Sequence, residues 1–257
     1  MGRGRGFRGF VVALVALGTL AFAPGAEAAI TEVFDGEATG GGAISCTEES
    51  DGVRFCGGPD TTVDSFDEVP IDVNLALPPE PTSGPDGNFP LIGIFHGWGG
   101  QESTLNGMRR FLDQGYAVFS MSDRGWDYSC GKDRPTRFLE PICQTTGYNR
   151  LMDTRYEVRD AQDFYAALVD EGVVDPDRLG SSGGSYGGGL SMALAALNDR
   201  QMMPDGSLVA WKSPVKGTPL SLAAAIPEIP WTDLAYSLVP NGGTLDYTED
   251  SDYFKRG

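Results

Sequence analysis

Apolar and polar residues alternate strictly over residues 69–77, and this pattern predicts a strand with Val69, Ile71, Val73, Leu75 and Leu77 on one face. The runs 90–95 and 116–121 are continuously apolar, which is typical of strands buried on both faces of a sheet. Shorter strands are predicted at 178–182 and 220–226. We expect the first of these strands to be antiparallel to the rest.

Three segments between these strands have apolar residues at helical spacing, namely 103–114, 154–170 and 186–197. Gly115 and Gly172 end the first two helices. The charged residues 155–160 are expected to form a solvated helix face. Strands that alternate with helices predict a doubly wound, mostly parallel sheet.

The amino terminus has the form of a secretory signal. Arg3, Arg5 and Arg8 precede an apolar stretch over 10–23, and Ala26 and Ala28 flank a small-residue cleavage site. We expect cleavage near Ala28 and an extracellular protein. The alternative is an uncleaved anchor, which the stretch disfavours because it is shorter than the ~20 residues that span a bilayer.

The remaining chain divides by composition into three parts. Residues 29–62 are rich in Gly, Thr, Glu and Asp and are expected to form an irregular segment. Residues 63–226 carry the predicted strands and helices and form the core. Residues 227–257 contain no predicted strand and are interpreted as the beginning of a cap or a linker, so that the sheet is expected to be incomplete in this chain.

Charge and cysteine content narrow the class of protein. A net charge of −17 would repel the phosphates of nucleic acids and the surfaces of anionic membranes. The chain therefore lacks the basic surface that is typical of nucleic-acid-binding proteins. The four cysteines favour local disulfides, Cys46 with Cys56 and Cys130 with Cys143. A zinc site is the alternative, but the chain has no C-x-x-C spacing and no accompanying histidine, so we expect neither metal nor cofactor.

The segment 183–187, Gly-Gly-Ser-Tyr-Gly, has the G-x-S-x-G form of a nucleophile elbow. In such an elbow a strained turn between a strand and a helix exposes the serine hydroxyl, and small neighbours allow the turn. A strand is predicted before Ser185 and a helix after it. Ser185 is therefore the candidate nucleophile of a serine hydrolase with the α/β-hydrolase fold.

The loop 96–100, His-Gly-Trp-Gly-Gly, follows the strand 90–95, where hydrolases of this fold carry an oxyanion loop. Gly97 and Trp98 supply candidate N–H donors, and the N–H of Tyr186 is the second donor. Trp98 and Trp126 are candidate pocket residues. His96 is expected to brace the turn.

The sequence contains no histidine after Ser185 that could act as the catalytic base of a serine hydrolase. His96 is the only histidine, and it precedes Ser185. Asp233 is a candidate acid but is more consistent with a structural role, since no histidine follows for it to orient. Lys212 or Lys216 could replace the base in principle, although their surroundings do not indicate a desolvated lysine.

Four segments together resemble the serine-peptidase family of the Xaa-Pro dipeptidyl-peptidases and the cocaine-esterase-like acyl hydrolases. They are 96–100, 122–126, 155–161 and 175–188. The resemblance implies an acyl-enzyme at Ser185, an oxyanion hole that uses the Tyr186 N–H, and a cap after the sixth strand that precedes the catalytic Asp and His. The family's oxyanion tyrosine is replaced here by Trp98.

The leading hypothesis is a secreted serine hydrolase that acts on an Xaa-Pro-like peptide or a small ester, with its catalytic Asp and His absent from these residues and this chain alone inactive. One alternative is a carboxylesterase. Another is a catalytically silent binding protein with the hydrolase fold.

Overall fold

A computed structural model describes residues 1–2, 29–34, 43–233 and 237 of the 257-residue chain. The predicted signal sequence and most of the predicted cap therefore lie outside the described residues. The strands are β1 (Glu32–Val33), β2 (Ile44–Glu48), β3 (Arg54–Cys56), β4 (Thr62–Asp64), β5 (Pro70–Leu77), β6 (Phe89–Phe95), β7 (Ala117–Met121), β8 (Val174–Gly184), β9 (Arg200–Met202), β10 (Leu208–Ala210) and β11 (Leu222–Glu228). The helices are α1 (Leu105–Leu112), α2 (Pro135–Phe138), α3 (Pro141–Thr145), α4 (Glu157–Asp170) and α5 (Tyr186–Leu197).

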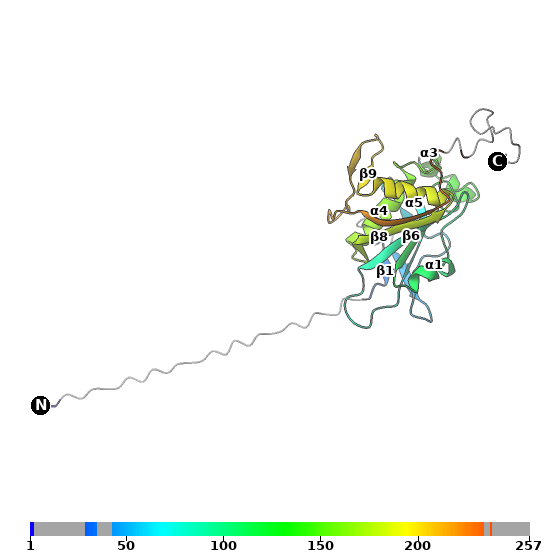
Figure 1. Cartoon of the computed structure of the whole chain (residues 1–257). Helices are drawn as coiled ribbons and strands as arrows, with labels where there is room; N and C mark the ends of the chain where they lie inside the picture. The colour runs from blue at the N-terminus through cyan, green and yellow to red at the C-terminus, as the bar shows by residue number, and fades with distance from the viewer. Residues whose placement is uncertain (3–28, 35–42, 234–236, 238–257) are drawn as a thin grey trace, which may run out of the picture.

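One mixed sheet organises the fold in the order β1-β2-β3-β5-β7-β6-β8-β11, with β4 paired to β5. Strands β7, β6, β8 and β11 are parallel to one another, whereas β5 runs antiparallel to β7 and to β3. Helices α4 and α5 cover one face and α1 covers the other (Figure 1). The prediction of a doubly wound, mostly parallel sheet of the α/β-hydrolase type is confirmed.

The hydrophobic pattern predicted the central elements closely. The alternating residues lie on β5 or directly before it and are all fully buried in the core cluster that also contains residues of α4 and α5. Helix α5 has the predicted bounds, and β11 continues to Glu228, two residues beyond the predicted core. The hairpin of β9 and β10 has no counterpart in the predicted elements.

The segment 29–62 differs from its predicted irregular structure, because β1, β2 and β3 lie within it and extend the sheet. These strands have two to five residues, so their alternation is too brief for a period to be recognised. Cys46 and Cys56 are opposite each other on β2 and β3 and form a disulfide. Cys130 and Cys143 form the other disulfide, so both predicted pairings are confirmed.

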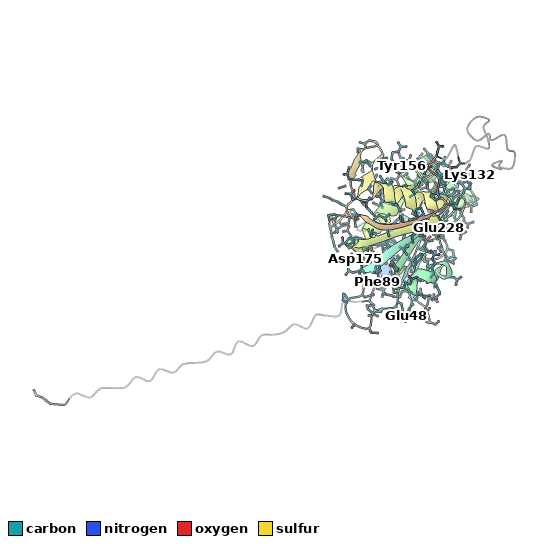
Figure 2. The ribbon with its side chains drawn as sticks, viewed as in Figure 1. Glu48, Phe89, Lys132, Tyr156, Asp175 and Glu228 are labelled. Atoms are coloured by element: carbon teal, nitrogen blue, oxygen red, sulfur yellow. A yellow bond between two sulfur atoms is a disulfide. The ribbon has the colours of Figure 1, made fainter. Side chains whose placement is uncertain are left out.

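The carboxyl ends of the parallel strands lie at one edge of the sheet, the edge where α/β proteins bind ligands. Figure 2 shows this polarity: Phe89 and Asp175 mark the amino ends of β6 and β8, and Glu228 marks the carboxyl end of β11 on the opposite side. Within the described residues, no helix has the length and apolar character needed to cross a membrane.

Candidate active site

Ser185 lies at the sharp turn between β8 and α5. Its backbone has φ 56° and ψ −113°, a conformation that L-residues rarely adopt. Its N–H donates a hydrogen bond to the carbonyl oxygen of Glu228 at 3.0 Å, so the neighbouring strand holds the turn. The residue is exposed, whereas Gly184 before it is half-buried and Tyr186 after it is buried. This turn has the strained backbone and exposed serine of the predicted nucleophile elbow.

The glycines around Ser185 permit this close packing. A Cβ atom on Gly187 would overlap the carbonyl oxygen of Phe95, and one on Gly183 would lie 2.8 Å from the same oxygen. Gly184, in contrast, has no atom within 4 Å of its Cβ position. Glycine is therefore required on the sheet side of the elbow and not at the position directly before the serine.

We expect Gly187→Ala to reduce labelling of Ser185 by a fluorophosphonate at least about tenfold, because the added methyl displaces the turn and misplaces the hydroxyl. Gly184→Ala is the matched control and is expected to label normally. Labelling rates followed by gel fluorescence provide the measurement. Equal loss in both variants would contradict a steric requirement at Gly187.

The loop 96–100 is held by the imidazole of His96. Nδ1 lies 2.7 Å from the carbonyl oxygen of Gly97, and Nε2 accepts a hydrogen bond from the N–H of Asp123 at 2.9 Å. Nδ1 therefore carries the proton, and burial lowers the pKa of His96, which keeps the ring neutral. Both ring nitrogens are engaged, so His96 braces the turn as predicted and is not available as a base for Ser185.

This loop packs against the elbow on its oxyanion side. A Cβ on Gly97 would lie 3.9 Å from the carbonyl oxygen of Gly184, and the carbonyl oxygen of His96 closely approaches Gly187. Tyr186 is the first residue of α5, and no intrahelical acceptor exists for an N–H at that position. The loop and the helix start thus adjoin each other beside Ser185.

Four aromatic residues surround the start of α5. The ring of Tyr186 lies 4.9 Å from Trp126, 5.6 Å from Trp98 and 5.9 Å from Trp231. The Tyr186 hydroxyl oxygen accepts hydrogen bonds from Asn149 Nδ2 at 2.8 Å and from the Met152 N–H at 2.7 Å, which fixes the ring. Trp98 is 64% exposed, so its indole forms an open apolar surface next to the buried tyrosine.

A buried ion-pair network supports the loop that carries Trp126. Arg124 is fully buried and donates two hydrogen bonds to Asp160 of α4 at 2.6 Å and two to Asp67 at 2.7 Å. Asp160 also accepts a hydrogen bond from Ser65. The prediction that residues 155–160 form a solvated face is wrong for Asp160 and Glu157, because both carboxylates are fully buried.

Burial raises the pKa of Glu157 to about 7. The charge of Asp160 acts in the same direction, while the Arg150 N–H hydrogen bond and the charge of Arg124 oppose it. Since the folded pKa lies above the ordinary value of 4.5, this carboxyl stabilises the fold below about pH 4.5, and the contribution is lost as the pH rises through 7.

The pKa of Asp163 is likewise raised to about 7, chiefly by burial and then by Asp160, against the opposing charge of Arg159. Asp67 raises this pKa further and Arg124 lowers it. Both groups therefore give the same sign of pH dependence. The folded state holds more protons than the unfolded state between about pH 4 and 7.

We expect the melting temperature to fall as the pH is raised from 5 to 8, because deprotonation of these groups is unfavourable in the folded state. Differential scanning fluorimetry across this range measures the slope. Asp163→Asn should make the melting temperature depend less on pH. Asp177 is an exposed aspartate of β8, and Asp177→Asn should leave the pH dependence unchanged. A melting temperature that rises toward pH 8 would contradict the assignment.

The two candidate lysines are not brought to the elbow. Lys212 and Lys216 are exposed and precede β11, at the amino end of the strand, whereas Ser185 lies at the carboxyl ends. Asp233 is exposed and follows Trp231, which reaches the ring of Tyr186. In the printed sequence no second histidine exists, so these residues contain no free imidazole for Ser185.

The sheet order, the elbow at Ser185 and the adjoining loop define an α/β-hydrolase, the class that includes serine esterases and serine peptidases. Residues 59–205 match the sequence model of the acetyl xylan esterase (AXE1) family, and the chain belongs to that family. The narrower resemblance to Xaa-Pro dipeptidyl-peptidases stays a prediction.

Solved structures similar to this chain include esterases and peptidases. An acetyl xylan esterase from Paenibacillus sp. R4 is 18% identical with a TM-score of 0.42, over 62% of this chain and 50% of that one. Acetyl xylan esterase 1 from Thermoanaerobacterium sp. JW/SL YS485 is 22% identical with a TM-score of 0.38, over 60% and 48%. A puromycin-hydrolyzing peptidase of Mycobacterium tuberculosis is 21% identical with a TM-score of 0.39, over 57% and 27%.

The chain spans about half the length of the two acetyl xylan esterase structures. A comparison with curated proteins found no match.

Proposed function

We propose that this chain is the nucleophile-bearing part of a serine esterase that removes short acyl groups, acetyl above all, from ester-linked substrates. The observation that carries the proposal is the strained, exposed Ser185 at the carboxyl end of β8. Its hydroxyl oxygen attacks the ester carbonyl carbon, the alcohol leaves with a proton, and water then hydrolyses the acyl-enzyme. Membership of the acetyl xylan esterase family supports an ester over an amide.

The developing oxyanion is held by backbone donors. The N–H of Tyr186 is one, and the N–H groups of Gly97 and Trp98 are the proposed others, because their loop packs beside the elbow. Each such donor contributes ~3 kcal/mol to the transition state in comparable sites. Donors on the backbone of a braced loop need no reorganisation when charge develops.

The proposed reaction requires an imidazole from outside these 257 residues, supplied by continuing sequence or by another chain. His96 cannot serve, since Nδ1 and Nε2 are both hydrogen-bonded within the fold. Without a base the serine hydroxyl keeps its high pKa and reacts slowly. A late Asp and His in the complete reading frame would supply the acid and base of the triad.

The substrate is proposed to be an acetylated carbohydrate outside the cell. The exposed indole of Trp98 meets Trp126 edge to face, with ring centroids 5.1 Å apart, and the apolar face of Trp98 that remains open suits the apolar face of a sugar ring. Two disulfides fit an oxidising compartment. The secretory signal at 1–28 remains the predicted route of export.

The test compares three substrate classes with the complete gene product that carries this chain. We expect acetate release from acetylated xylo-oligosaccharides and from p-nitrophenyl acetate, with little cleavage of Xaa-Pro p-nitroanilides. Preferential cleavage of the anilides would replace the esterase by the peptidase. No turnover of any of the three, in a complete reading frame without a later histidine, would favour a silent binding protein.

A further inference from the structure

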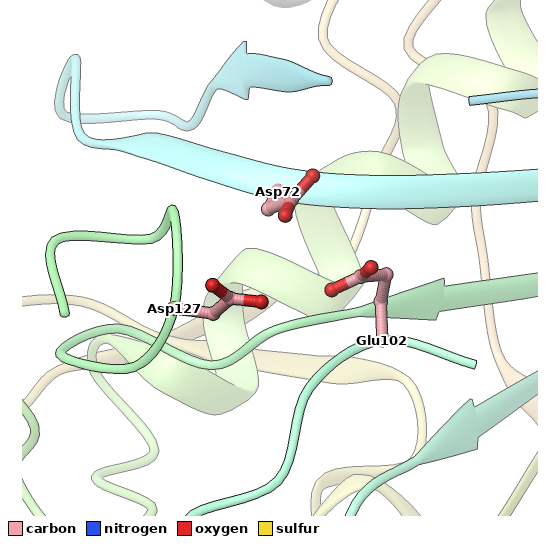
Figure 3. A group of neighbouring side chains, drawn as sticks. All are labelled: Asp72, Glu102 and Asp127. Carbon is pink, nitrogen blue, oxygen red and sulfur yellow. The ribbon is translucent and has the colours of Figure 1, made fainter. Parts of the chain in front are cut away.

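Three carboxylates from separate parts of the chain converge on one buried position. They are Asp72 on β5, Glu102 between β6 and α1, and Asp127 after β7 (Figure 3). One oxygen from each lies within 4.8 Å of the others. Calcium–oxygen bonds are ~2.4 Å long, so two oxygens on opposite sides of one calcium ion lie ~4.8 Å apart, which equals the upper limit of the separations in this cluster.

Asp72 is the strongest indication of a ligand. The residue is fully buried, and neither carboxylate oxygen has a hydrogen bond of good geometry among the described residues, the backbone N–H of Thr61 being the one donor that acts on it. A buried carboxylate with so little hydrogen bonding is costly unless a cation compensates it.

The neighbouring groups do not neutralise the cluster. Arg134 forms an ion pair with Asp127 and a longer one with Asp133 at 3.5 Å, and Ser122 donates a hydrogen bond to Glu102. One guanidinium thus faces three carboxylates, and Asp60 adds another negative charge nearby.

The cluster opens into a cavity of about 310 Å³, which leaves room for water ligands. The cavity wall includes the three carboxylates, Asn74, Tyr128 and Arg134. All the candidate protein ligands are oxygens, which are the ligands of hard cations, and calcium accepts several waters beside carboxylates.

We propose that Asp72, Glu102 and Asp127 bind a calcium ion. The ion would join β5 to the two loops that frame the elbow, because Glu102 follows the loop 96–100 and Asp127 follows Trp126. The sequence pattern does not show this site, since its residues are 25 to 55 positions apart and follow no ligand motif. The proposed role is to hold these loops, independently of the proposed esterase activity.

The test uses the complete gene product after treatment with a chelator. Calcium is titrated to about 1 mM, the weak end of the affinities of extracellular calcium sites, with terbium as a luminescent analogue. We expect terbium emission sensitised by Tyr128 to saturate at one ion per chain. We also expect calcium to raise the melting temperature, while magnesium raises it less.

Variants separate a specific site from general acidity. Asp72→Asn should lower the affinity at least about tenfold and abolish the calcium-induced rise in melting temperature, while the metal-free variant melts higher than the metal-free parent. Arg134→Gln should bind calcium more tightly, because a competing cation is removed. Asp177→Asn, with the same loss of charge on the surface, should bind like the parent.

Absence of saturable binding in the parent, or undiminished binding in Asp72→Asn, would overturn the proposal. If Asp72→Asn does not fold, Glu102→Gln and Arg134→Gln decide the question through their opposite expected shifts. Ester turnover is not a readout in this test, so its outcome and that of the esterase assay are independent.

Discussion

Ser185→Ala is expected to reduce kcat/KM of the complete gene product for an acetyl ester by about 10⁶-fold, close to the loss seen when a catalytic serine is removed elsewhere. The proposed acyl-enzyme forms on the Ser185 hydroxyl, and Ser185 is the only serine, threonine or cysteine of the segment 183–187. Ser83→Ala, a change to an exposed serine between β5 and β6, should leave turnover unchanged. Steady-state hydrolysis of p-nitrophenyl acetate measures both.

Retained turnover in Ser185→Ala would refute the nucleophile assignment. A separate measurement tests the elbow itself, whether or not a base is present. Ser185→Gly should raise the free energy of unfolding by about 1 kcal/mol, since glycine relieves a positive φ that costs a serine ~1–3 kcal/mol but adds entropy to the unfolded chain. A loss of stability would show that the turn is unstrained.

Arg124→Met is expected to lower the free energy of unfolding by about 3–5 kcal/mol, the range found when one partner of a buried ion pair is removed. The change leaves Asp160 fully buried opposite an apolar side chain and releases Asp67 from its two hydrogen bonds. The loop that carries Trp126 should also lose its anchor to α4. Urea denaturation provides the measurement.

The double variant Arg124→Met/Asp160→Leu should recover most of this loss, because the unpaired carboxylate that remains, Asp67, is partly exposed to solvent. Arg155→Met is the matched control: Arg155 is 42% exposed and pairs with Asp153, and such a pair contributes less than about 1 kcal/mol. Equal losses in Arg124→Met and Arg155→Met would contradict the importance of the buried network.

Local pattern was sufficient for the elements that form the centre of the sheet. The alternating apolar residues of β5 belong to the main hydrophobic core, although the polar residues between them are buried as well, and α5 follows the Gly-rich turn with the bounds that its apolar residues predict. The G-x-S-x-G segment was recognised from five contiguous residues, which is local information. The reason for glycine at 187 is instead tertiary, because the carbonyl oxygen of Phe95 on β6 occupies the position of a side chain there.

Charged residues were harder to interpret, because burial of a charge depends on a partner that is distant in sequence. Asp160 resembles any surface residue of an amphipathic helix until Arg124, 36 positions earlier, is placed against it. Asp72 likewise occupies a polar position in an alternating strand, and only the two loops beyond β6 and β7 make it a buried member of an acidic cluster.

The sequence by itself determined the sheet class, the exposed serine, the turn-bracing role of His96 and the two disulfides, because each follows from contiguous residues or a short loop. Only the tertiary structure decided which carboxylates are buried, how Trp98, Trp126 and Tyr186 meet beside Ser185, and where a cation could bind. Those features arise where loops from separate strands meet at the carboxyl edge of the sheet. The residues that form them are far apart in the sequence and follow no regular spacing.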